Sequence, residues 1–204
     1  MFVIVALGES ILVTGADFGE VPASAGTLAA FVVAFAGSVT LWWLYFDRAE
    51  EAARRVIAAA SDPGRLALSA YTFFHIPMVA GIIATAAMDE LTIAHPGEGA
   101  TVAPTALILG GPALSLLGHV LFKWVVWGHL ARPRLVAIGA QIALLPVATV
   151  SSRLVLLIAV TLVLGGLAQR DVRAEMAGDG TTRGDRAFAP PLPVAGGEAS
   201  RERG

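Results

Sequence analysis

Residues 24–46 read SAGTLAAFVVAFAGSVTLWWLYF, a stretch without a charged side chain that is long enough to cross a bilayer. A membrane-spanning helix needs about 20 predominantly apolar residues. Residues 66–88 and 103–122 meet the same requirement. These three stretches predict an all-α fold, a polytopic bundle of transmembrane helices.

The composition agrees with a membrane protein. The 204-residue chain is 56% hydrophobic and only 15% charged, whereas a soluble domain carries about 25% charged residues. The net charge of −2 gives no basic surface for nucleic acid. Cysteine is absent, which excludes disulfides, thiolate metal sites and cysteine nucleophiles. We therefore expect membrane lipids as partners, no nucleic acid and no cofactor.

Three shorter apolar stretches bring the expected number of spans to about six. They are residues 2–14, 133–150 and 151–169. The last two meet at Ser151-Ser152-Arg153, where we expect a tight helical hairpin. A re-entrant pair that does not cross the bilayer is the alternative.

The basic residues fall on alternate connections between these stretches. Those following 24–46, 103–122 and 151–169 hold all but one of them: Arg48, Arg54, Arg55, Arg65, Lys123, Arg132, Arg134, Arg170, Arg173, Arg183, Arg186, Arg201 and Arg203. Basic residues favour the cytoplasmic side of a membrane. The alternation predicts that both termini are cytoplasmic.

The last part of the chain has a different composition. Residues 170–204 mix charge, glycine and proline, as in Pro190-Pro191-Leu192-Pro193. Such a mixture buries too little apolar surface to fold. We predict a transmembrane domain over 1–169 and a disordered cytoplasmic tail over 170–204.

A carboxylate lies inside the first apolar stretch. Glu9 and Ser10 follow Gly8, and His75 lies at a similar depth on the third span. At about 1.5 Å per residue, Glu9 and His75 are each roughly 10–14 Å from the predicted cytoplasmic face. A carboxylate beside an imidazole can pass a proton, and intramembrane charges are commonly functional. The alternative is a structural role, in which Glu9 only holds helices together.

Several residues predict kinks or close helix packing. Pro77 follows His75 closely and should kink the third span, because proline lacks a backbone N–H. Gly110, Gly111 and Pro112 invite a break or kink in the fourth span. Gly111, Ser115 and His119 share one helix face, and Gly118 adds a small residue for close approach. His119 lies nearer the cytoplasmic end than His75, so we do not expect direct contact between them.

No pattern of a known catalytic centre is present. The chain lacks the phosphate-binding loop, the Gly-x-Ser-x-Gly elbow and the His-Glu-x-x-His zinc motif. We expect no metal site and no enzymatic activity.

Four segments together resemble the bacterial low temperature requirement A (LtrA) family. They are FVIVALGESIL at 2–12, WWLYFD at 42–47, YTFFHIPMVAG at 71–81 and GGPAL through Gly118-His119 at 110–119. The resemblance covers residues 1–169. It implies a multi-pass protein of the bacterial inner or plasma membrane, linked to low-temperature or stress adaptation, with no established biochemical activity.

Typical members of that family are longer and have further spans upstream. The resemblance therefore implies that this chain is a C-terminal half. It also implies that the missing N-terminal half, or other protomers, supply partners for Glu9 and His75.

Two functional hypotheses follow. The first is ion- or proton-coupled transport through Glu9, Ser10, His75 and His119, with an unknown substrate. The second is a noncatalytic membrane scaffold whose buried polar residues are structural.

Overall fold

The computed structural model describes residues 2–46, 53, 56–60, 62–128 and 130–187. The chain divides into two units, residues 1–169 and residues 170–204. Each unit is considered by itself.

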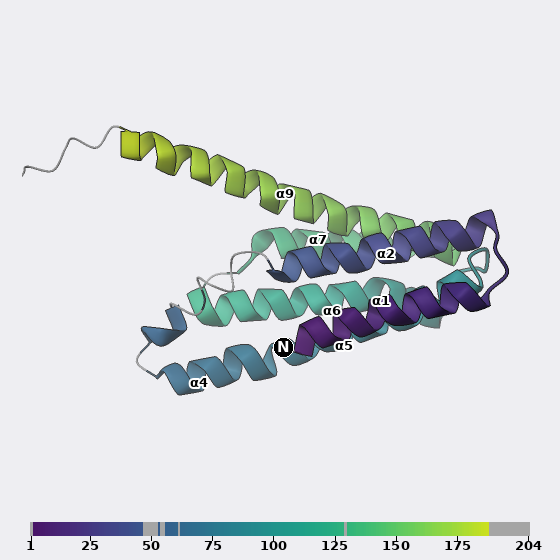
Figure 1. Ribbon diagram of the computed structural model, residues 1–204, viewed down its shortest axis with the longest axis horizontal. Coiled ribbons are helices and arrows are strands. Elements are labelled where there is room, and N and C mark those ends of the chain that lie inside the picture. Colours follow the sequence, from purple (N-terminus) through teal and green to yellow (C-terminus); the bar gives the residue numbers. More distant parts are fainter. Residues whose placement is uncertain (1, 47–52, 54–55, 61, 129, 188–204) are drawn as a thin grey trace, which may run out of the picture. The chain divides into compact units, whose positions relative to one another are not determined.

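The described residues form helices joined by short connections (Figure 1). In chain order these are α1 (Phe2–Glu20), α2 (Ala25–Phe46), α4 (Pro63–Leu68), the π-helix η1 (Ser69–Phe73), α5 (His75–Ala94), α6 (Val102–Trp127), α7 (Arg132–Ala143), α8 (Leu145–Ala148) and α9 (Arg153–Ala187). No strand occurs among them beyond an isolated bridge between Gly99 and Ser152. The predicted all-α class is confirmed.

Four helical stretches in the described part of the chain are long and apolar enough to cross a membrane. They are Ala25–Phe46, Pro63–Ala94, Val102–Trp127 and Arg153–Ala174. A shorter apolar stretch covers Val3–Ala16, and α7 with α8 occupies the predicted fifth span. This arrangement is roughly consistent with the predicted count of about six.

The connection before α9 shows where the fifth span ends. The backbone N–H of Arg153 donates to Glu98 O (2.9 Å), and that of Ala100 donates to Ser151 O (3.2 Å). The Arg153 guanidinium also pairs with the Glu98 carboxylate at 2.7 Å. Residues 95–101 precede α6, so α7 and α8 bring the chain back to the end where α6 begins. A hairpin of two crossing helices requires this return, and a re-entrant pair does not.

Helix α5 packs against three other helices, α1, α2 and α6.

The α5–α6 contact is close because small residues meet along it. A Cβ added at Gly81 would lie 2.5 Å from Gly111 O, and one at Gly118 would lie 2.5 Å from Met78 Cγ. We call Gly81, Gly111, Ser115 and Gly118 the glycine seam. Because the residues at these points are glycine or serine, the two backbones approach closely.

Helix α6 shows no break at Gly110-Gly111-Pro112, and the alternative expectation of a kink stays a prediction. It runs without interruption from Val102 to Trp127, with Pro112 buried in its interior. Gly111 lies in the glycine seam, whereas a Cβ on exposed Gly110 would meet nothing within 4 Å. A continuous helix keeps Gly111, Ser115 and Gly118 in register against α5, which favours it over a broken one.

Helix α9 continues through residues 170–187, inside the stretch predicted to be disordered. Residues 188–204, including the proline-rich sequence, lie outside the described residues. The disordered tail stays a prediction there.

Candidate functional site

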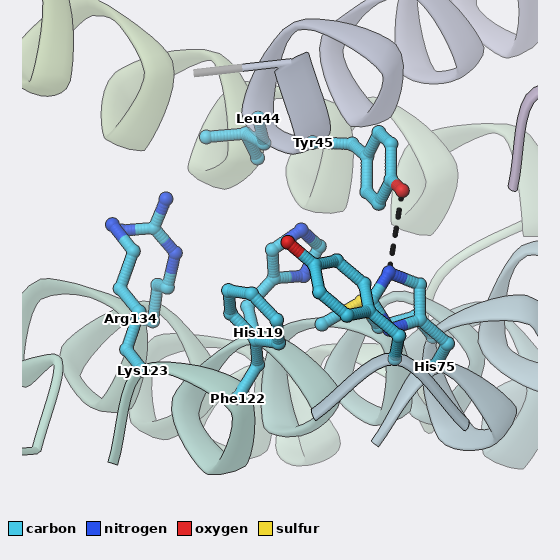
Figure 2. A pocket seen from close by; sticks show the side chains of 9 residues that line it. Leu44, Tyr45, His75, His119, Phe122, Lys123 and Arg134 are labelled. Atoms are coloured by element: carbon cyan, nitrogen blue, oxygen red, sulfur yellow. Dashed lines mark hydrogen bonds between the residues drawn. The ribbon is translucent and has the colours of Figure 1, made fainter. Parts of the chain in front are cut away.

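Side chains from several helices, polar and apolar, line a small, partly open cavity with about 30 Å³ of space for water-sized molecules (Figure 2). We call it the histidine cavity. Its lining residues come from α2, η1, α5, α6 and α7: Leu44, Tyr45, Tyr71, His75, Met78, His119, Phe122, Lys123 and Arg134. The cavity therefore depends on the packing of elements from four separate parts of the chain: α2, η1 with α5, α6 and α7.

A local change of helix type positions His75. In η1 the N–H of Phe74 donates to Ser69 O (3.3 Å), five residues back instead of four. The His75 ring then reaches back so that Nδ1 bonds Ala70 O at 2.9 Å. Pro77 follows two residues later and has no N–H to give to the Phe73 carbonyl. The predicted irregularity at Pro77 is thus a π-turn immediately before His75, of a kind frequent at functional sites.

The hydrogen bonds of His75 define which nitrogen carries the proton. A carbonyl oxygen only accepts, so Nδ1 must donate to Ala70 O. In the neutral ring Nε2 is then an acceptor. The Tyr45 hydroxyl, 3.2 Å away, donates to it (Figure 2). Tyr45 thereby ties the end of α2 to the start of α5.

His119 is held in the same manner on α6. Its Nδ1 donates to Ser115 O at 2.9 Å, and the side chain is 7% exposed. Its Nε2 is buried, and no group in the described part of the chain hydrogen-bonds to it. The neutral ring presents a lone pair at this atom.

The structure brings both histidines to one cavity, and the expectation that they do not touch directly stays a prediction. The Tyr45 ring contacts each of them, with centroids 5.9 Å from His75 and 6.2 Å from His119. Phe122 also packs edge-on against His75 at 5.6 Å. The sequence argument compared depths along separate spans and could not include an aromatic ring that links them.

Two basic residues complete the lining. Lys123 lies near the end of α6, and Arg134 lies in the first turn of α7 and is only 3% exposed. Their charges disfavour a divalent cation in the cavity. Within the described residues, no three metal-ligating side chains gather at one point. Sequence reasoning had assigned both residues to a cytoplasmic connection and missed them as site residues.

Glu9 lies away from this cavity. It is exposed on α1 and does not line the cavity. Nothing in the described part of the chain joins it to His75 by a hydrogen bond or ion pair. The side chain of Ser10 is not among those described. A role for Glu9 and Ser10 stays a prediction.

Asp89 is a buried charge that the sequence analysis missed. It is 1% exposed on α5, and neither carboxylate oxygen has a hydrogen-bond partner among the described residues. The predicted third span ended at Met88, whereas α5 continues to Ala94, because the Asp89-Glu90 pair reads as the start of a loop. The available signal was spacing: Asp89 follows Thr85 by four residues and Ile82 by seven, on one buried helix face.

Comparison with known proteins gives a family match. The sequence model of the bacterial low temperature requirement A protein (LtrA) family matches residues 1–169. An uncharacterized protein of Rhizobium meliloti (strain 1021) is 35% identical over 125 residues, which cover 61% of this chain and 31% of that protein. No solved structure matches the chain.

The match bears on the expectation of a C-terminal half. The segment aligned with the Rhizobium meliloti protein spans only 31% of that protein's length. Neither this coverage nor the family match places the chain in the C-terminal half of a longer protein, so that part of the expectation is not borne out. The family match itself covers residues 1–169, the whole of the first unit. The chain belongs to the bacterial low temperature requirement A (LtrA) family.

Proposed function

We propose that this protein moves protons, or an ion coupled to them, across a bacterial membrane through the histidine cavity. The observation that carries the proposal is the convergence of two imidazoles and a phenol, His75, His119 and Tyr45, from three helices. Imidazoles exchange protons near neutral pH. Ionisable groups inside membrane helices commonly mark ion or proton pathways.

The proposal includes a cellular role and a location. The family name supports a link to growth at low temperature, and we extend the proposed role to stress adaptation. The alternating basic residues support both termini in the cytoplasm and the inner or plasma membrane as the location. Under this orientation the histidine cavity lies toward the cytoplasmic end of the bundle, near the end of α2.

The partners are also part of the proposal. Exposed Glu9 on an apolar helix would be costly to hold against lipid. We propose that further helices, from the rest of a longer protein or from other protomers, cover that face of α1. The remaining helix surfaces contact membrane lipids, and nothing in the composition favours nucleic acid.

A noncatalytic scaffold is the second candidate. The observation that favours it is that each histidine uses Nδ1 to bond a backbone carbonyl, Ala70 O or Ser115 O. Bonds of this kind stabilise helices without transport. Neither candidate assigns the protein an enzymatic reaction.

Proton flux separates the two candidates. The native full-length protein is reconstituted in liposomes that contain a pH-sensitive dye, and a pH gradient is applied. We expect flux above that of empty liposomes, and its loss in His75→Ala and His119→Gln. Glu9→Gln tests whether the pathway also needs the exposed carboxylate.

His95→Ala is the matched control, because His95 is exposed in the connection before α6. It should conduct like the native protein. Folded protein with no flux under either direction of gradient would contradict transport and favour the scaffold.

A further inference from the structure

Two residues that line the histidine cavity, on different elements, each carry a buried polar atom without a partner among the described residues. These atoms are the Tyr71 hydroxyl on η1 and Nε2 of His119 on α6. No described residue hydrogen-bonds to either atom. Buried polar atoms in folded proteins nearly always have a partner, so these two indicate a bound molecule.

The chemistry of the two atoms is complementary. Because Nδ1 of His119 donates to Ser115 O, Nε2 needs a donor. The Tyr71 hydroxyl carries a hydrogen that it can donate. A molecule between them must therefore both donate and accept a hydrogen bond.

The size and charge of the cavity restrict that molecule. Its volume is about 30 Å³, and one water needs about 10–15 Å³ on this measure. Lys123 and Arg134 line the same cavity and repel a cation. A simple anion such as chloride has no hydrogen to donate to Nε2 and cannot be its partner. A neutral donor and acceptor of this size is water.

We infer that the histidine cavity binds an ordered water that donates to His119 Nε2 and accepts from the Tyr71 hydroxyl. Proton exchange at His119 then runs through this water, since no described side chain donates to Nε2. The water site stands on the geometry alone. Its use in proton movement rests on the proposed function.

Solid-state NMR tests the water site without any assay of transport. The full-length protein, ¹⁵N-labelled at histidine, is studied in lipid bilayers, with His75→Gln and His119→Gln used for assignment. We expect His119 to carry its proton on Nδ1 and to show a correlation between Nε2 and water protons. The absence of a correlation between His119 Nε2 and water protons, or a proton carried on Nε2, would overturn the inference.

Two hydroxyl deletions sharpen the test. Tyr71→Phe should reduce the water correlation of His119 to the noise level. Tyr45→Phe removes a hydroxyl from the same cavity and should shift only the Nε2 signal of His75, to which Tyr45 donates. An unchanged His119 correlation in Tyr71→Phe would refute the bridging position.

Flux measurements on the same variants distinguish failure of the water route from failure of the proposed function. If His119→Gln abolishes flux and Tyr71→Phe does not, transport stands and the route through the water is wrong. If the native protein shows no flux, transport fails, and the NMR result still decides the water site. Loss of flux in both variants supports the route.

Discussion

Two acidic side chains, Glu9 and Asp89, differ in burial in a way that their sequence surroundings do not indicate. Glu9 interrupts an apolar run, yet the structure places it on an exposed face of α1. Asp89 ends an apolar run in the sequence, yet it is almost fully buried on α5. Hydropathy identifies both as charges near the membrane. Only the packing of helices tells which of them is enclosed by protein.

Replacement of Asp89 by leucine should raise stability. A buried polar group without a partner is unfavourable by about 1–3 kcal/mol, and an apolar group of similar shape removes that term. We expect Asp89→Leu to raise the midpoint of thermal unfolding of the detergent-solubilised full-length protein.

The neighbouring Glu90 is exposed and serves as the control. Glu90→Leu should change stability by less than about 0.5 kcal/mol. A lower midpoint for Asp89→Leu would mean that the carboxylate has a stabilising partner in the complete protein.

The packing of α5 against α6 depends on small residues as well as on large apolar ones. At the glycine seam, α5 and α6 approach so closely that a Cβ added to Gly81, Gly111 or Gly118 would overlap atoms of the facing helix. Small residues at i and i+4 in the sequence correctly indicated a packing face on the fourth span. Their partner on α5, Gly81, was not identified, because spacing within one helix says nothing about which helix lies opposite.

Adjacent glycines on α6 provide a direct test of this packing. A Cβ at Gly111 would lie 2.7 Å from Thr85 Oγ1, so Gly111→Ala should destabilise the bundle by about 1–3 kcal/mol through overpacking. Gly110→Ala meets no atom within 4 Å and should stabilise the helix by about 0.5–1 kcal/mol. Thermal unfolding in detergent measures both changes. Equal midpoints for the two variants would contradict the seam.

At the scale of the whole transmembrane unit, the connections at one end of the bundle organise the topology. Hydrogen bonds join residues 96–100 to residues 151–154, and Glu98 pairs with Arg153. These two connections must lie on the same side of the membrane. The charge alternation predicted this arrangement independently, because Arg153 was the one basic residue outside the cytoplasmic connections.

The absence of cysteine makes the topology directly measurable. Gly97→Cys lies in the connection before α6, and Gly64→Cys lies at the start of α4. We expect a membrane-impermeant maleimide to label position 97 in intact cells and position 64 only after permeabilisation. Labelling of position 64 in intact cells would contradict cytoplasmic termini.

The sequence by itself determined the class of the fold, the approximate spans and the residues that could carry polar chemistry. It could do so because apolar length and basic-residue asymmetry are local properties of the chain, set by the thickness and charge of a bilayer. His75, His119 and the small residues of α6 were identified from the same local patterns.

The tertiary structure alone decided which of those residues meet. No site role was expected for Tyr45 and Tyr71, and Lys123 and Arg134 were assigned to connections. The packing of α2, η1, α6 and α7 brings all four to one cavity. The physical reason is that side chains converge through helix rotation and close approach. Those depend on contacts such as the glycine seam, between residues distant in sequence.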